Sequence, residues 1–175
     1  GKEMDKFTNL TFEVGKWILE NTNNEDVFLA HDESAFMITA LSGRKVVFVR
    51  RVHANYFVDV NKRYADGIVM LYSNNSYIVK DLLLQYNVKY VYVDYFLVSY
   101  PLITSLEHAD YLKDNEIKFS VEEVRWDPST ELSPKFKSIV VYPQQLGSIT
   151  NFLVPIKEFK INNQTGGVVY KVIIK

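Results

Sequence analysis

The first pattern along the chain is an apolar stripe at helical spacing near the N-terminus. Hydrophobic side chains recur at intervals of three and four residues, at Phe7, Leu10, Val14, Trp17 and Ile18. This spacing predicts an opening amphipathic helix, because side chains three and four positions apart lie on the same helix face. The helix should end near residues 21–24, where asparagine and threonine favour a turn.

Three short apolar runs come next, each bounded by polar residues. They predict buried strands over residues 27–30, 45–49 and 88–93. Each connection between them is long enough for a right-handed crossover. We therefore expect the three strands to be mutually parallel and to belong to one sheet.

Segments of helical spacing separate these strands. Residues 34–41 predict a helix that Asp32 is placed to cap and that Gly43 is placed to end in a left-handed conformation. Between the second and third strands, two more helices are expected over residues 56–71 and 78–86, divided by a polar run. Such alternation of strands and helices is typical of an open α/β sheet.

The pattern changes after Asp94. Residues 95–111 are aromatic and apolar, contain Pro101 and predict no definite element. Further along, alternation with a period of two and apolar runs predict strands over residues 117–121, 138–142, 152–161 and 168–174. The polar turn over residues 162–167 ends in two glycines and predicts a terminal antiparallel hairpin.

Together these elements predict the fold class α/β, with a small open parallel sheet, flanking helices and a β-rich C-terminal part. We place the parallel, Rossmann-like part at residues 1–95 and the β-rich part at residues 96–175. No linker rich in proline, glycine or serine separates the two parts, so we expect them to share one core.

Composition narrows the class of protein. With 175 residues, 47% of them hydrophobic, the chain is long enough to bury a sizeable core. The net charge of -1 gives no overall basic field, which argues against a nucleic-acid partner. The absence of cysteine excludes disulfides, thiolate zinc sites and thiol catalysis.

The chain is expected to be a soluble fragment of a longer protein. No apolar run approaches the ~20 residues needed to cross a bilayer, and the N-terminus has no signal-like apolar core. Gly1 stands where an initiator methionine is absent, which indicates excision from a longer chain.

The candidate chemistry lies where the three parallel strands end. Residues that directly follow parallel strands meet along one sheet edge, where such folds bind ligands. These residues are His31, Asp32, Glu33, Arg50, Arg51, His53, Asp94 and Tyr95. Such a set suits binding of a phosphate, a sugar or a divalent ion, or proton transfer. The alternative is that the same groups only cap helices and pair with one another.

Catalytic and cofactor motifs are missing from the sequence. The three histidines have no metal-ligand spacing, and neither a Gly-x-Gly-x-x-Gly nor a Gly-x-Ser-x-Gly pattern occurs. We therefore predict no catalytic residue, no metal site and no cofactor. Coordination of a hard cation by Asp32 and Glu33 stays open as an alternative.

Two further features are candidates for structural and modification roles. Arg44 follows Gly43 and enters the second strand, and we expect it to hold this turn by pairing with Asp66 or Asp26. Three Asn-x-Ser/Thr sequons are candidate acceptors of N-glycosylation on an extracytoplasmic face, at Asn9, Asn74 and Asn163.

Several segments carry a resemblance to a known family. The most specific are Leu41-Ser42-Gly43-Arg44, Arg50-Arg51-Val52-His53-Ala54-Asn55 and Val88-Lys89-Tyr90-Val91-Tyr92-Val93. With the chain around them, from Trp17 to Asp94, they resemble the soluble C-terminal domain of polytopic archaeal and bacterial membrane glycosyltransferases. These are enzymes of the GT-C type, related to oligosaccharyltransferases and protein mannosyltransferases.

The resemblance implies an accessory domain on the extracytoplasmic face of the cell membrane. Members of the family use polyprenyl-phosphate-linked sugars, and their catalytic acidic residues sit in membrane-associated loops, so none carries over to this chain. The implied partners are the membrane-spanning part of its own parent protein and the polyprenyl-phosphate sugar or the acceptor. Contacts are expected through Arg44, Arg50, Arg51 and His31.

Two other function classes stay open. One is a self-contained small α/β enzyme or sugar-binding module that uses the strand-end cluster around His31. The other is an interaction scaffold, which a large exposed apolar patch without a pocket would favour.

Overall fold

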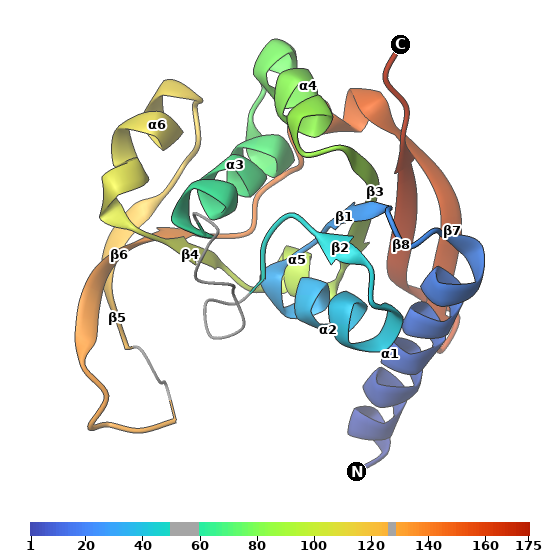
Figure 1. The fold of residues 1–175 in the computed structure, drawn as a ribbon. Helices are drawn as coiled ribbons and strands as arrows, with labels where there is room; N and C mark the ends of the chain where they lie inside the picture. Colours follow the sequence, from blue (N-terminus) through green and yellow to red (C-terminus); the bar gives the residue numbers. More distant parts are fainter. Residues whose placement is uncertain (50–59, 126–128) are drawn as a thin grey trace.

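A computed structural model describes residues 1–49, 60–125 and 129–175 (Figure 1). Within these residues one sheet contains β1 (Val27–Leu29), β2 (Lys45–Val46), β3 (Val88–Asp94), β7 (Leu153–Ile161) and β8 (Gln164–Val172). The strand order is β2-β1-β3-β8-β7, so β1 and β3 lie inside the sheet.

The predicted parallel arrangement is confirmed. β1 pairs in parallel with β2 on one side and with β3 on the other. The second strand is shorter than the predicted residues 45–49, because its pairing with β1 covers Lys45 and Val46. The α/β fold class is therefore correct, and the hairpin of β7 and β8 extends the parallel sheet through antiparallel pairing of β8 with β3.

Helices cover both faces of this sheet (Figure 1). α1 (Lys2–Asn21) and α2 (Asp32–Ser42) pack on one face, and α3 (Val60–Tyr72) and α4 (Ser76–Gln85) pack on the other. Successive side chains of a strand point to opposite faces. Phe28 accordingly joins the cluster under α1 and α2, while Val27 and Leu29 join the cluster under α3 and α4.

The apolar stripe predicted for the first helix is the face that α1 buries. Leu10, Val14 and Ile18 pack with Tyr92 and Phe159 in one buried cluster. Full burial of such a side chain stabilises the fold by about 1.5–3 kcal/mol. The stripe thus fixes which side of α1 meets the sheet.

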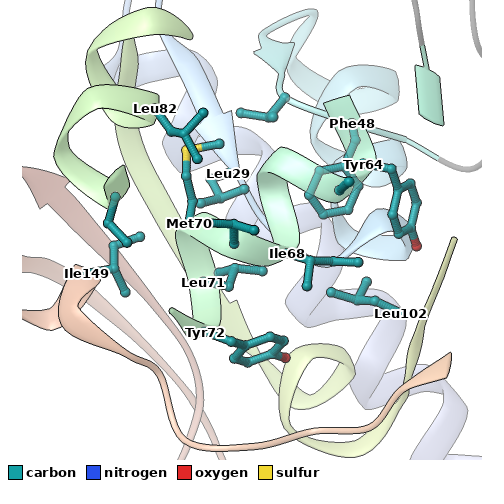
Figure 2. Close-up of a cluster of buried hydrophobic side chains, with 14 of the residues drawn as sticks. Leu29, Phe48, Tyr64, Ile68, Met70, Leu71, Tyr72, Leu82, Leu102 and Ile149 are labelled. Carbon is teal, nitrogen blue, oxygen red and sulfur yellow. The ribbon is translucent and has the colours of Figure 1, made fainter. Parts of the chain in front are cut away.

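The larger core surrounds α3, in which residues 64–72 are all buried. Figure 2 shows buried side chains from several elements around this helix, among them Leu29, Ile68, Met70, Leu82 and Leu102. A helix that is buried on every side packs against more than one layer. Here the second layer is a separate sheet in the order β4-β6-β5, which within the described residues contains β4 (Leu102–Thr104), β5 (Ser120–Arg125) and β6 (Lys135–Val141).

One carboxylate lies inside this core. Asp66 on α3 is fully buried and accepts hydrogen bonds from the Lys62 ammonium (2.9 Å) and from the hydroxyls of Tyr86 and Tyr111. Burial and the hydrogen bond to Asp66 raise the pKa of Tyr111 above its ordinary value, so this phenol remains a donor. A buried charge is tolerated when its oxygens are all satisfied in this way.

The segment that the sequence left unassigned contains several short elements. These are α5 (Tyr95–Ser99), β4, the 3₁₀ helix η2 (Leu106–His108) and α6 (Ala109–Asp114). Another 3₁₀ helix, η3 (Ser148–Phe152), precedes β7. Elements of three to six residues are too short to show a period, which is why no pattern predicted them.

The terminal hairpin is confirmed, but its turn is shorter than the predicted residues 162–167. Asn162 and Asn163 form the turn with φ of 51° and 65°, a conformation that asparagine tolerates better than most residues. Gly166 and Gly167 belong to β8 instead. A Cβ at Gly167 would collide with the Tyr92 hydroxyl, so close packing requires glycine at that position.

The pairing of β8 with β3 joins the two predicted parts in one sheet. Tyr90 lies opposite Lys171 and Asp94 lies opposite Gly167. Residues 1–95 and 96–175 therefore both contribute strands to it, and the boundary between them stays a prediction.

Arg44 is a buried cation at the ends of two helices. Its side chain donates to the Thr22 hydroxyl (2.9 Å), the Asn24 side-chain oxygen (2.8 Å) and the carbonyls of Thr22 (2.9 Å), Leu19 (3.1 Å) and Ser42 (3.1 Å). These five bonds use all five N–H donors of a guanidinium. The C-terminal ends of α1 and α2 are thereby held together.

The prediction that Arg44 pairs with Asp26 or Asp66 is wrong. Asp26 accepts from the Asn23 backbone N–H (2.7 Å) and lies 3.4 Å from the Lys89 ammonium, while Asp66 lies in the tyrosine cluster on α3. Helix C-termini carry partial negative charge on unsatisfied carbonyls. The two helix ends therefore replace the carboxylate that the sequence led us to expect.

Arg44→Ala should lower the free energy of unfolding by about 3 kcal/mol, because buried oxygens lose their charged donor. For a chain of this length the melting temperature should fall by roughly 6–12 °C. Circular dichroism during heating measures the shift, and Arg44→Lys should be intermediate because an ammonium has three donors.

Lys45→Ala is the matched control for this prediction. Lys45 is the next residue, is exposed, and pairs on the surface with Glu25. Loss of such a pair changes stability by less than about 1 kcal/mol. Equal melting temperatures for the Arg44→Ala and Lys45→Ala proteins would contradict the role given to the guanidinium.

Candidate functional site

The predicted strand-end residues meet in part at the carboxyl ends of β1 and β3. His31 follows β1 and is the N-cap of α2, where its Nδ1 lies 3.2 Å from the Glu33 backbone N–H donor. The prediction that Asp32 caps this helix is wrong by one residue, because Asp32 is the first residue inside α2. A carboxylate in the first turn still interacts favourably with the helix dipole.

His31 is buried, with 2% of its surface exposed. Its Nδ1 lies 3.0 Å from Asp32 Oδ1, and its Nε2 lies 3.2 Å from the Pro101 carbonyl oxygen. The protonated ring donates from Nδ1 to Asp32 and from Nε2 to Pro101. The neutral ring with its proton on Nε2 still donates to Pro101, and its Nδ1 lone pair accepts from the Glu33 N–H instead. Burial alone lowers the pKa of His31, but its bonds to Asp32 and Pro101 and the charge of Asp94 outweigh burial and raise it.

Asp32 is the acceptor of this network. Its Oδ2 receives the Tyr64 hydroxyl at 2.6 Å, so α3 is joined to the start of α2. Burial raises the pKa of the Asp32 carboxyl, but the hydrogen bonds from His31 and Tyr64 outweigh burial and hold that pKa below its usual range. Asp32 is therefore an anion held by three elements of the fold.

Asp94 ends β3 and is the N-cap of α5. Its Oδ1 accepts from the Leu97 backbone N–H (3.3 Å), and its Oδ2 accepts from the Ser34 hydroxyl of α2 (2.5 Å). Burial raises the pKa of the Asp94 carboxyl above its usual range, against the lowering effect of these bonds. Asp32 and Asp94 thus have opposite pKa shifts although both lie near His31.

The remaining predicted residues differ in what they contribute. Glu33 is half-buried in the first turn of α2, and Tyr95 is exposed at the start of α5 beside Phe96 and Tyr100. Arg50, Arg51 and His53 lie outside the described residues. The three sequon asparagines are exposed: Asn9 lies on α1, Asn74 precedes α4, and Asn163 lies in the turn between β7 and β8.

A concave site lies beside this cluster and was missed by the sequence reasoning. It is a cavity of about 560 Å³ between the end of β3, α5 and the β7–β8 hairpin. We call it the hairpin groove; its lining residues are Val93, Asp94, Tyr95, Val98, Ile161, Asn162, Gln164, Thr165, Gly166, Gly167, Val168 and Tyr170. Ligand pockets commonly have volumes of about 300–1,000 Å³.

The two parts of this groove were each predicted from the sequence, but as separate features far apart in the chain. Asp94 and Tyr95 were predicted at the sheet edge, and the hairpin was predicted separately. Only the antiparallel pairing of β8 with β3, with Gly167 opposite Asp94, brings the two together. No local pattern shows a pairing between strands so far apart in the chain.

The strand-end residues and the hairpin groove differ in how accessible they are to a ligand. His31 and Asp32 are engaged in capping and in joining α2 and α3, whereas Asp94 caps α5, bonds to α2 and also lines the hairpin groove, which opens to solvent. In the described ranges, no group of three or more histidine, aspartate and glutamate side chains is arranged to hold a metal ion. Nor does any helix there have both the length and the apolar character needed to span a membrane.

Comparisons with known proteins give structural matches but no sequence family. A scan against protein-family models finds no match, and a search of curated proteins finds none. Among solved structures, the chain is similar to the C-terminal globular domain of oligosaccharyltransferase from Archaeoglobus fulgidus. The sequence identity is 11% and the TM-score 0.47, with 91% of this chain and 94% of that chain covered. These values do not show a family.

The raised pKa of His31 predicts a pH-dependent stability. A group whose folded pKa is raised stabilises the fold fully below its unfolded pKa, here 6.5, and loses this contribution as the pH rises through the folded value. The unsubstituted protein should therefore lose stability above about pH 6.5 relative to His31→Asn, which keeps a helix-capping oxygen but does not titrate. Urea unfolding at a series of pH values measures both curves, and parallel curves would contradict the assignment.

Proposed function

We propose that this chain is an accessory extracytoplasmic domain of a membrane glycosyltransferase that uses lipid-linked sugars. The domain is not catalytic alone. It packs against the membrane-spanning part of its own parent protein and contributes to the site where the donor sugar or the acceptor is held.

The sequence resemblance from Trp17 to Asp94 supports a membrane glycosyltransferase as the parent protein. In the structure this range contains β1, β2 and β3, so the resemblance falls on the strands that make the parallel part of the sheet. The turn formed by Ser42, Gly43 and Arg44 ends α2, with Gly43 at φ 69° and ψ 9°. Those of the resembling residues that the structure describes therefore form the parallel part of the sheet and the turn that ends α2.

The geometry of the strand-end cluster supports an accessory role, and this observation carries the proposal. His31 and Arg44 were expected to contact substrate, but both are buried and bonded to backbone or neighbouring side chains. A general acid or base must reach the reacting group within hydrogen-bond distance. Contact with a substrate therefore falls to the exposed hairpin groove rather than to the histidine.

A sugar-binding module is the second candidate, and the hairpin groove favours it. The groove combines tyrosines with amide and hydroxyl side chains, which is a composition suited to a hydroxyl-rich ligand. This candidate differs from the first in needing no membrane-spanning partner.

Two measurements on the chain test the proposal. The purified chain should show no sugar transfer from a polyprenyl-phosphate sugar analogue to an acceptor, because the family's catalytic acids are expected on the parent protein. Turnover by the chain that disappears in Asp32→Asn would overturn the accessory role and favour a self-contained enzyme. Asp32→Asn keeps the shape of the side chain but removes a charge that holds His31 and Tyr64, so circular dichroism of the variant must show that it is folded before a loss of turnover is assigned to catalysis.

The parent protein provides the second test. Its full reading frame should contain several apolar segments of about 20 residues besides this chain. Deletion of this chain from the membrane protein should then abolish or strongly reduce sugar transfer. Unchanged transfer without it would contradict an accessory function.

A further inference from the structure

The hairpin groove has a lining that discriminates between classes of ligand. Among its side chains, Asp94 supplies a carboxyl group and none is lysine, arginine or histidine. Lysine and arginine side chains commonly recognise phosphate and carboxylate groups, and this lining contains neither and places a carboxyl group there instead. The groove is therefore unsuited to an anionic ligand.

The polar groups of the groove are neutral amides and hydroxyls beside one carboxylate. Asn162, Gln164 and Thr165 lie at the exposed end of the hairpin, and Asn162 and Gln164 each have both donors and an acceptor. Such groups pair with hydroxyls, which also donate and accept. The Thr165 hydroxyl already donates to Glu158 (2.5 Å), and an apolar ligand would leave the amides of Asn162 and Gln164 without partners, at a cost in affinity.

Asp94 is held in a fixed orientation within this lining. The Leu97 backbone N–H and the Ser34 hydroxyl each take one of its oxygens. The Phe96 backbone N–H also bonds this carboxyl group. A carboxylate has about four acceptor positions, so roughly one remains for a ligand. That position can accept a sugar hydroxyl in a charge-assisted hydrogen bond.

Tyr95 supplies a large aromatic surface that is locked in place. Its ring lies edge-to-face with Phe96 (centroids 6.1 Å apart) and with Tyr100 (5.8 Å apart), yet 48% of its surface is exposed. Aromatic rings combine an apolar body with a polar tip and suit ligands that have both kinds of surface. A fixed ring also loses little conformational entropy on binding.

We propose that the hairpin groove binds a neutral saccharide of one or two rings, with Asp94 accepting a ring hydroxyl and Tyr95 packing on the apolar face of the sugar. A volume of about 560 Å³ accommodates a ligand of this size. The inference deepens the proposed function by naming the ligand class of this groove, and it rests on that function for the source of the sugar.

Titration of the isotope-labelled chain with neutral glycosides tests this directly by NMR. The probes are methyl glucoside, methyl mannoside and N-acetylglucosamine, with glucuronate and glucose 1-phosphate as charged counterparts of similar size. At least one neutral probe should shift the backbone amides of Tyr95, Gln164 and Gly166, with a dissociation constant of about 1–10 mM. The charged counterparts should bind at least about fivefold more weakly.

Variants assign the binding to the groove. Asp94→Asn should weaken binding about tenfold while keeping a helix-capping oxygen, and Tyr95→Ala should weaken it about fivefold. Gln164→Ala, an exposed position in the lining, gives a variant that leaves Asp94 and its caps intact. The control is Tyr77→Ala on α4, which removes an exposed tyrosine outside the lining and should leave affinity unchanged within twofold.

The outcomes separate this inference from the proposed function. No shift with any neutral probe up to about 50 mM, tighter binding of the charged probes, shifts with a short peptide alone, or equal weakening by Tyr77→Ala each overturns the saccharide groove. None of these results changes the outcome of deleting the chain from its parent protein. Conversely, saccharide binding by a chain whose deletion leaves transfer unchanged would support the groove and contradict the accessory role.

Discussion

The short strand β1 is the constraint on which the rest of the structure depends. It lies inside the sheet between β2 and β3, and all three of its residues are buried. Because both faces are covered, Phe28 packs under one pair of helices and Leu29 under the other. Parallel strands covered on both faces read as continuous apolar runs. The order of helices around the sheet follows from satisfying both sides of this strand.

The end of β1 leads directly into a helix terminus, whose backbone groups need hydrogen-bond partners. Polar side chains supply these partners. The chain passes from β1 directly into α2, and His31 caps the helix while Asp32 and Asp94 take hydrogen bonds from neighbouring elements. At the other end of α2 the Arg44 guanidinium satisfies carbonyls of two helices. Charged residues near a ligand-binding edge can thus be required by the backbone itself. The clustering of acid, base and imidazole in sequence is therefore poor evidence for catalysis.

Much of the fold was predictable for two reasons. The helix with Val14 and Ile18 and the terminal hairpin are long enough to show a pattern, and the parallel strands are marked by continuous apolar runs between polar residues. The short elements between Tyr95 and Asp114 have none, since local propensity is overridden by packing in pieces of this size. The partners of Arg44 could not be predicted either, because sequence shows carboxylates but not where helix ends converge. The hairpin groove could not be predicted, because it depends on the pairing of β8 with β3, which no local sequence pattern shows.

That pairing has a consequence for how the chain reaches its native state. β8 follows the other strands of this sheet in the described sequence, and it lies between β3 and β7, with Tyr90 opposite Lys171. During synthesis, the edge of β3 therefore lacks this neighbour until the residues of β8 have been made. Contacts between residues so far apart in the sequence slow folding, and the exposed apolar edge of β3 promotes aggregation until β8 pairs with it. β8 therefore completes a sheet that forms around β1 and β3.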